Sequence, residues 1–285
     1  MVCAFVVSCA QPPRPIAPAP APVTVTVTAP TPSDREESPR GVRVILEGNA
    51  LVPSAELLPV LLVDKPDAAG LHGQDLLDRD VLWLTVAYLD RGFLDVRIEP
   101  PVFARAPDGP FVDVRFSIHE GVRYRIRKLT VSEHDASGKE IVPLGTKKLR
   151  ERLLLHEGDV FARDVFVRDV SAIQKLYRDA SYAHVDTDVK TDLDPARAEV
   201  DVTLIVRRNE PSVIDRIVVA GNHAVKSETI RSAVGIADGE RWSDTRLIEA
   251  KARLLGLGLF KRVDISSVDK PSKSRMTVTF EVEEN

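Results

Sequence analysis

The sequence predicts an α+β fold of three tandem β-α-α-β-β units, each a three-stranded mixed sheet covered by two helices. Three observations predict it. A strand with strict apolar alternation recurs three times, a more polar strand and a turn precede each copy, and a helical periodicity precedes each hairpin. The alternating strands are Val112–Ile118, Val200–Val206 and Met276–Val282. With 285 residues, 44% of them hydrophobic, the chain can bury several small cores.

Each unit is expected to begin with an opening strand and a short helix. The opening strands are predicted at Val42–Leu46, Arg123–Val131 and Ile214–Val219, and the short helices at Pro53–Val63, Thr146–His156 and Lys226–Val234. Gly48-Asn49 and Gly221-Asn222 predict a tight turn after the first and third opening strands. The second opening strand is followed instead by a longer loop, Ser132–Lys139.

A longer helix follows in each unit. The helices are predicted at Asp75–Arg91, Arg163–Asp179 and Ser243–Leu255, and each ends near a small residue that precedes an apolar one. Ser243 is expected to cap the third of these helices, with Trp242 and Leu247 as a hydrophobic staple around the cap.

Each unit closes with a hairpin whose second strand is the more polar one. These second strands are predicted at Leu94–Glu99, Ala183–Val189 and Lys261–Ser266. The third strand has the cleanest apolar alternation and is placed in the centre, parallel to the opening strand across a right-handed crossover. The second strand then forms a sheet edge, guarded by charged residues. The three domains are predicted at residues 41–120, 121–209 and 210–285.

Residues 1–9, MVCAFVVSC, resemble a signal segment with a lipoprotein processing box, in which Cys9 would be acylated. A secretory signal ordinarily starts with basic residues, and no Lys or Arg precedes Cys9. The alternative is an N-terminus without regular structure that carries two incidental cysteines.

Residues 10–40 are predicted to be a proline-rich, disordered linker. Nine prolines and no glycine lie between Gln11 and Pro39, and proline disfavours helices and inner strands. Within this linker, Val23–Thr28 alternates Val and Thr. This run is interpreted as extended linker, and the alternative is a strand that pairs with an exposed sheet edge of this molecule or another.

Composition argues against several classes of function. A net charge of −4 disfavours nucleic-acid binding through a strongly basic surface. The two cysteines, Cys3 and Cys9, both precede the predicted domains, which excludes a cysteine-ligated metal site or a catalytic thiol there. His119-Glu120 and His156-Glu157 lack the second histidine of a zinc-protease motif. The sequence therefore predicts no enzyme activity, no cofactor and no metal.

The predicted units resemble POTRA (polypeptide-transport-associated) domains over about residues 41 to 285. The resemblance rests on the Gly-Asn turns, on the runs Tyr88–Val96 and Leu254–Val263, and on the strand endings Glu120-Gly121 and Glu283-Glu284. The second unit departs from the pattern, because it has Ser181 in place of glycine and no Gly-Asn turn.

The resemblance implies a function, because tandem POTRA domains precede the outer-membrane barrel in assembly factors of the BamA and TamA family. It implies a scaffold on the periplasmic side of the outer membrane that assists assembly or secretion of outer-membrane proteins. Its partners would be unfolded outer-membrane or secreted polypeptides, an outer-membrane barrel protein and assembly lipoproteins, with a lipid anchor or partner as the membrane tether. Two alternatives are a structural, division-type interaction module and the periplasmic fragment of a BamA-like protein whose barrel is missing.

The mechanism expected from this organisation is strand addition at the second strands, whose unpaired backbone groups an extended client could satisfy. The residues expected to mark these edges are Leu94, Val96, Ile98, Val185, Val189, Val263 and Ile265. The alternative for their side chains is that they face the helices, so that only the backbone of the edge is functional.

Overall fold

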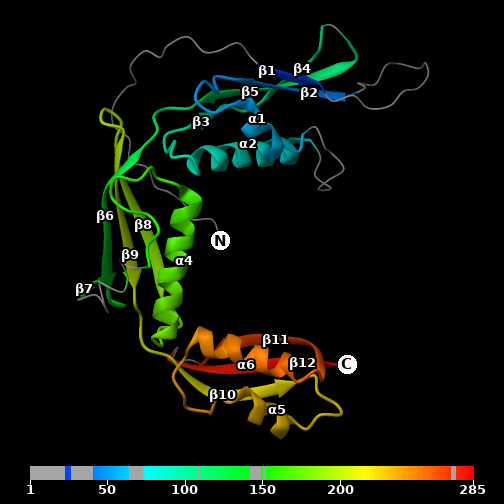
Figure 1. Cartoon of the computed structure of the whole chain (residues 1–285), viewed down its shortest axis with the longest axis vertical. Helices are drawn as coiled ribbons and strands as arrows, with labels where there is room; N and C mark the ends of the chain where they lie inside the picture. The colour runs from blue at the N-terminus through cyan, green and yellow to red at the C-terminus, as the bar shows by residue number, and fades with distance from the viewer. Residues whose placement is uncertain are drawn as a thin grey trace, which may run out of the picture.

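The computed structural model describes residues 23–26, 41–63, 73–107, 109–141, 149, 152–270 and 274–285. It contains three α+β units in series, and the first and third units project to the same side of the middle one (Figure 1). In each unit, helices cover one face of a mixed sheet, as the sequence predicts (Figure 1).

The third strand of each unit pairs in parallel with the opening strand. These parallel pairs are β2 (Gly41–Glu47) with β5 (Phe111–His119), β6 (Arg125–His134) with β9 (Glu199–Arg207), and β10 (Val213–Ala220) with β12 (Arg275–Glu284). The second strand pairs antiparallel with the other side of the third strand, so the third strand is central in every unit. Burial explains this order, because alternate residues of the third strands, such as Val202, Val278 and Phe280, are at most 1% exposed.

The helices follow the predicted order. They are α1 (Ser54–Leu57) with the 3-10 turn η1 (Leu58–Val60), α2 (Gln74–Leu89), α4 (Arg163–Asp179), α5 (Ser227–Val234) and α6 (Asp244–Gly256). Ser243 caps α6 as predicted, since its hydroxyl accepts a hydrogen bond from the Arg246 amide. Trp242 and Leu247 are both buried beside it. Of the predicted helix Thr146–His156, Leu149 is helical, residues 152–156 form a turn and loop and not a helix, and the other residues lie outside the described part of the chain.

The second strand of the first unit differs from the prediction. It is split into β3 (Arg97–Ile98) and β4 (Val102–Arg105), which pair with successive parts of β5. Pro100 and Pro101 separate them, because proline has no N–H to donate to the ladder. In the other units the second strand is continuous, as β8 (Asp186–Asp194) and β11 (Phe260–Asp269).

Two further strands extend the sheets. The strand β1 (Val23–Thr26) pairs antiparallel with β2. The alternative, a strand that pairs with a sheet edge of this molecule, is therefore right for these residues, and the interpretation as extended linker is wrong for them. The predicted loop Ser132–Lys139 instead continues β6 and turns into β7 (Glu140–Ile141). Cys9 and the rest of residues 1–40 lie outside the described residues.

A buried carboxylate links the end of the third strand to the loop after the opening strand. In the first unit Glu120 is 6% exposed and accepts hydrogen bonds from the Leu51 amide at 2.7 Å, the Val52 amide at 3.0 Å and the Tyr88 hydroxyl at 2.9 Å. Burial and the nearby Glu120 carboxylate raise the pKa of Tyr88, which therefore stays a hydrogen-bond donor. Glu120 thus holds the end of the third strand against the loop after the opening strand and against α2.

The other units use related arrangements. In the third unit Glu284 accepts hydrogen bonds from the amides of His223, Ala224 and Val225, and these bonds lower the pKa of Glu284. In the second unit the carboxylate is Glu133 of the opening strand, and Arg208, directly after the third strand, lies 3.6 Å from it. An arginine thus stands at the end of the third strand of this unit, where the other two units have a glutamate.

The joints between units repeat one backbone contact. The Gly92 carbonyl accepts a hydrogen bond from the Tyr124 amide at 2.8 Å, and the Ser181 carbonyl accepts one from the Ser212 amide at 2.6 Å. Gly92 and Ser181 both have a positive φ, of 93° and 81°, which turns the chain after the helix. Ser181 therefore preserves the geometry that glycine provides in the first unit.

The joint between the second and third units is also tied by Asp179, at the end of α4. Its carboxylate accepts hydrogen bonds from the Ser243 hydroxyl at 3.0 Å and from the amide and hydroxyl of Thr245, both at 2.7 Å, and pairs with Lys175 at 2.9 Å. Burial would raise the pKa of Asp179, but these hydrogen bonds outweigh it and lower the pKa to about 2.

We expect Asp179→Asn to loosen this joint, because an amide cannot accept all of these hydrogen bonds. The distribution of distances between spin labels on the second and third units should broaden, while Asp192→Asn, a matched exposed change on β8, should leave it unchanged. An unaltered distribution in both variants would show that Asp179 does not hold the joint.

The same carboxylate gives a pH dependence with a defined sign. Because the folded pKa is depressed, the stabilisation by Asp179 is fully present above the ordinary aspartate pKa of about 3.9 and is lost as the pH falls through about 2. A carboxyl-carbon NMR titration of Asp179 checks this, and a midpoint near 3.9 would contradict it.

Candidate strand-accepting edges

Every unit has a second strand whose only strand partner in the described residues is the third strand. These strands are β3 and β4 in the first unit, β8 in the second and β11 in the third. In an antiparallel ladder, alternate residues point their N–H and C=O groups away from the partner strand. The outer side of each second strand therefore presents backbone donors and acceptors that an added strand could pair with.

The register of β11 shows which residues do so. The Lys270 amide donates to the Arg275 carbonyl at 2.9 Å, so this pair is hydrogen-bonded and the pairs alternate from there along the ladder. The alternation places the backbone groups of Val263 and Ile265 on the outer edge, whereas those of Asp264 point to β12. The Val263 side chain is 1% exposed and belongs to the core, so it is the backbone of this residue that faces outward.

In the first unit the same reasoning applies to Ile98 and to a residue that sequence reasoning missed. The Glu99 amide donates to the Ser117 carbonyl, which turns the Ile98 backbone outward. The Ala106 amide donates to the Phe111 carbonyl, which likewise turns the Phe103 backbone outward. The side chains of Phe103 and its neighbour Val102 are 66% and 64% exposed. The strand β4 is therefore an edge with outward backbone groups and exposed apolar side chains.

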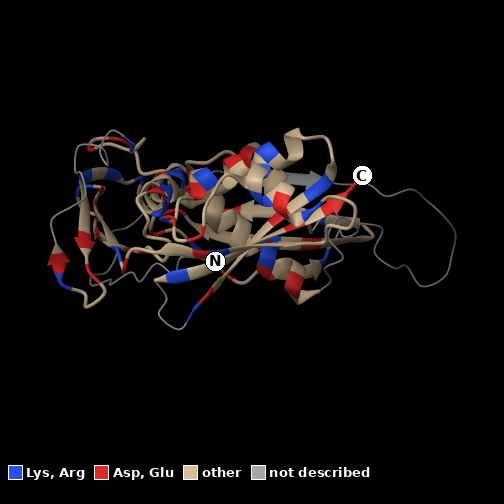
Figure 2. Cartoon of the chain, turned by 90° about the horizontal axis from the view of Figure 1, so that it is seen from below, with Lys and Arg blue, Asp and Glu red and all other residues tan. Residues whose placement is uncertain are grey.

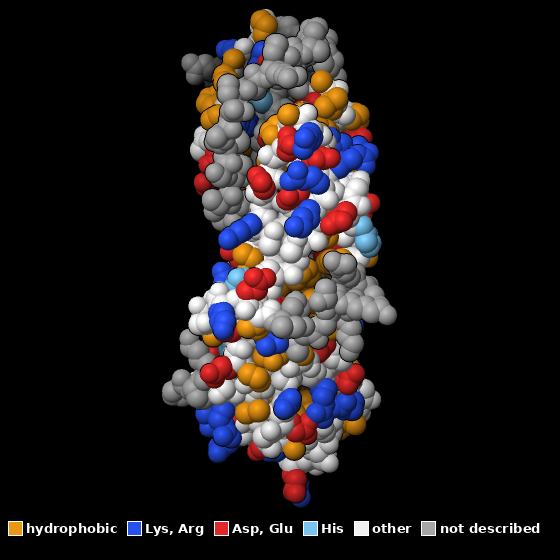
Figure 3. Space-filling view, turned by 90° about the vertical axis from the view of Figure 1, so that its left-hand side faces the viewer, with side chains coloured by type: hydrophobic (Ala, Val, Ile, Leu, Met, Phe, Trp, Pro, Cys, Tyr) orange, Lys and Arg blue, Asp and Glu red, His pale blue; other side chains and the backbone are white. Residues whose placement is uncertain are grey.

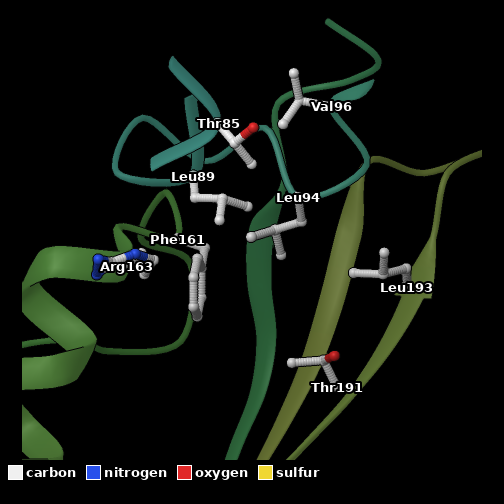
Figure 4. Close-up of a pocket in the computed structure, with 8 residues that line it drawn as sticks. All are labelled: Thr85, Leu89, Leu94, Val96, Phe161, Arg163, Thr191 and Leu193. Carbon is white, nitrogen blue, oxygen red and sulfur yellow. The ribbon is translucent and has the colours of Figure 1, made fainter. Parts of the chain in front are cut away.

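Leu94 and Val96 lie outside the strands. Leu94 is in a turn after α2, and Val96 immediately precedes β3. Both side chains line a largely apolar hollow of about 190 Å³ between the first and second units (Figure 4). The remaining lining residues are Thr85, Leu89, Phe161, Arg163, Thr191 and Leu193. Thr191 and Leu193 belong to β8, so the hollow adjoins the edge strand of the second unit.

The edge of the second unit has a different chemistry. Val189 lies in β8 and Val185 just before it, and both pack against the core of that unit. The exposed residues that alternate with the inward side chains are mostly acidic, namely Asp186, Asp188, Lys190 and Asp192. Charged side chains lie close together over the middle of the molecule in Figure 3. Because charge on an edge discourages pairing with another chain, β8 is the best guarded of the three edges.

Other kinds of site find no support in the described part of the chain. Its residues include no group of three or more His, Cys, Asp and Glu side chains placed to hold a metal ion. None of its helices is long and apolar enough to cross a membrane. Basic and acidic residues are interspersed along the ribbon (Figure 2).

The sequence profile of one family matches two adjacent stretches that together make up more than half of the chain. The family is POTRA, described as surface antigen variable number repeat, and the matches are residues 130–209 and 212–285. The chain belongs to the POTRA family. The first unit falls outside these matches, but it has the POTRA strand order of the other two, with additional strands at its edges.

Relatives and solved structures point to one group of POTRA proteins. The chain is 24% identical over 252 residues to the outer membrane protein assembly factor BamA of Nitratidesulfovibrio vulgaris, covering 85% of this chain and 31% of that protein. It is 21% identical to a putative outer membrane protein assembly factor of Treponema pallidum, covering 76% of this chain and 26% of that protein. The chain thus spans about a third of the length of these relatives or less.

The crystal structure of POTRA domains 3–5 of Haemophilus influenzae BamA has the same fold. It is superimposed with a TM-score of 0.66 at 20% identity, covering 86% of this chain and 95% of that one. The serial arrangement of three POTRA units is therefore shared with a BamA fragment.

Proposed function

We propose that this chain is a periplasmic scaffold, on the inner side of the outer membrane, that assists the assembly, insertion or secretion of outer-membrane β-barrel proteins. Its POTRA units and its similarity to assembly factors named BamA support this proposal. The observation that carries the mechanism is the set of second-strand edges, where Ile98, Phe103, Val263 and Ile265 turn their backbone groups outward.

The proposed mechanism is β-augmentation, in which an extended client segment pairs as an additional strand. Backbone pairing depends little on client sequence, so one edge serves clients of varied sequence. Each contact is weak, and several edges in series on one chain raise the overall affinity through effective concentration. This suits a scaffold that must also release its client.

The side chains beside each edge determine which edges are best suited to bind a client. The exposed Val102 and Phe103 of β4 offer apolar contact beside the outward backbone, whereas the acidic face of β8 opposes acidic clients. We therefore assign the main client contacts to β4 and β11. The hollow beside β8 offers space for one apolar client side chain next to Thr191 and Leu193.

The remaining parts of the proposal concern residues without a described structure. Cys9 would be the acylated residue that tethers the chain to the outer membrane, and an outer-membrane barrel protein or assembly lipoproteins would be its folded partners. The proposed domains remain residues 41–120, 121–209 and 210–285, and β1 is an addition to the sheet of the first.

The edge mechanism is tested with proline at positions whose N–H points outward. The double variant Phe103→Pro/Ser267→Pro removes one outward donor from β4 and one from β11, because Ser267 alternates with the inward-bonded Ser266. The matched control is Phe103→Ala/Ser267→Ala, which loses the same side chains and keeps both donors. We expect the proline variant to bind a fluorescein-labelled synthetic β-barrel strand about tenfold more weakly than the control.

Fluorescence anisotropy gives the two dissociation constants, and circular dichroism checks that both variants keep the wild-type fold. Equal affinity of the proline and alanine variants, with the fold intact, would exclude pairing at these edges. A proline at Asp264 would be a poor probe, because its N–H belongs to the internal ladder with β12.

A further inference from the structure

The opening-strand edge of the first unit is occupied by a segment of the same chain. Strand β1 pairs antiparallel with β2 through four consecutive residue pairs, from Val23 with Leu46 to Thr26 with Arg43. This edge lies on the opposite side of the sheet from β3 and β4, so it is distinct from the edges assigned above.

In the described residues of the other units, no strand like β1 runs along the opening strand. In the third unit β10 is the last strand of its sheet in the described residues, and on this side it has only an isolated bridge from Val213 to Arg241 at its start. In the second unit the strand paired with β6 on this side, within the described residues, is the two-residue β7, at Glu133 and His134, and an isolated bridge joins Arg125 to Val160. The partner strand β1 is thus an addition to the shared fold and not a part of it.

The pairing of β1 covers only part of the available edge. Strand β2 has seven residues and β1 has four, so Gly41, Val42 and Glu47 lack a residue of β1 opposite them. Short strand pairs are marginally stable in water, but β1 and β2 belong to one chain, and linkage within a chain gives effective concentrations of roughly millimolar. A longer strand from another molecule could form more hydrogen bonds with β2 than β1 does.

We infer that β1 is a resident strand that occupies a second strand-accepting site, the outer edge of β2, until a client strand displaces it. This inference rests on the proposed function, because it requires that clients pair as strands. The resident strand would cover the edge of β2 while no client is present. Only a client segment that pairs with more residues of β2 than β1 does would displace it.

The residues of β2 indicate the client chemistry. Val44 and Leu46 point to the helices and belong to the core, and Ile45 points to the other face, where it lies between Thr24 of β1 and Arg115 of β5. Ile45 is nevertheless only 6% exposed. A client that takes the place of β1 should be an antiparallel, extended segment of at least seven residues with β-branched residues in alternation, as the run Val-Thr-Val-Thr of β1 itself has.

The test uses the full chain with the other edges weakened by Phe103→Pro/Ser267→Pro. In this background Thr24→Pro and Val25→Pro are each expected to disrupt β1. Alternate residues of an antiparallel strand direct their N–H groups at the partner, so one of these two variants removes an N–H that donates to β2. The control is Thr31→Pro, the same change outside the strand. The probe is a fluorescein-labelled synthetic peptide of eight alternating Val and Thr residues.

We expect at least one β1 variant to bind the peptide about threefold or more tightly than the control, because apparent affinity rises with the fraction of molecules in which β2 is uncovered. Amides within Arg43–Leu46 should exchange hydrogen faster in that variant and regain protection with peptide. Unchanged affinity and exchange in both variants would overturn the inference.

The outcome also separates this inference from the proposed function. Peptide that binds wild-type protein and perturbs amide resonances of β11 or β4, but never those of Gly41–Glu47 in any variant, would overturn the resident-strand inference and leave the proposed function intact. Peptide that perturbs no edge in any variant would overturn both.

Discussion

Replacing Gly221 with alanine is expected to destabilise the third unit by roughly 3 kcal/mol or more. Gly221 has a φ of +79°, and a Cβ atom there would lie 2.3 Å from the Val282 carbonyl oxygen. The variant therefore combines the cost of a positive φ with a backbone clash that no side-chain rotation relieves. Gly48 holds the same position in the first unit, with a Cβ 2.0 Å from the Ile118 carbonyl oxygen.

Gly239→Ala is the matched control in the same unit. Gly239 has a φ of +88° but no atom within 4 Å of its Cβ position, so its cost should be limited to about 1–2 kcal/mol of backbone strain. Hydrogen exchange of the β10 and β12 amides measures both effects in the third unit alone. Equal losses in the two variants would mean that the approach to Val282 contributes nothing.

The second large effect is expected for Glu120→Ala, at roughly 3–5 kcal/mol in the first unit. The change leaves the amides of Leu51 and Val52 and the hydroxyl of Tyr88 without their acceptor in a buried corner. Glu120→Gln should cost less, because an amide keeps one acceptor oxygen for these donors.

The control for Glu120 is Glu56→Ala, which removes an exposed carboxylate paired with Arg91 at 3.0 Å and should cost less than about 1 kcal/mol. Hydrogen exchange of α2 and β5 amides in urea reports the stability of the first unit separately from the others. A loss for Glu120→Ala no greater than that for Glu56→Ala would contradict the role given to the buried carboxylate.

The regular parts of the fold could be predicted because their burial is periodic. Helix α4 has its predicted bounds, Arg163–Asp179, since its apolar residues repeat at helical spacing. The alternation of the third strands identified them as central, because the alternate residues are core residues in all three sheets. The exceptions are local. Pro100-Pro101 divides a strand, and the predicted loop after the second opening strand leads into a short hairpin partner, β7. The alternation of Val23–Thr28 allows a linker or a strand, and the pairing of β1 with β2 decides between them.

The candidate edges could be predicted only in outline. The sequence identified second strands as edges, but the direction of each backbone N–H depends on register, which the structure defines through bonds such as Lys270 to Arg275. The sequence does not reveal Phe103 as an edge residue, because a Pro-Pro pair is typical of a strand end, whereas β4 begins directly after it. The alternation of its apolar neighbours predicts a strand at Leu94, whereas it belongs to the turn between α2 and β3.

The arginine at the end of the third strand of the second unit, where the other units have a glutamate, means that the three repeats are not interchangeable. Grafting the last strand of the third unit onto the second would bring Glu284 next to Glu133, two carboxylates without the cation that Arg208 provides. The reverse graft would set Arg208 against the three amides that Glu284 accepts from, with donors facing donors. The last strands of the second and third units therefore cannot be exchanged without loss of stability, although the two units share one fold.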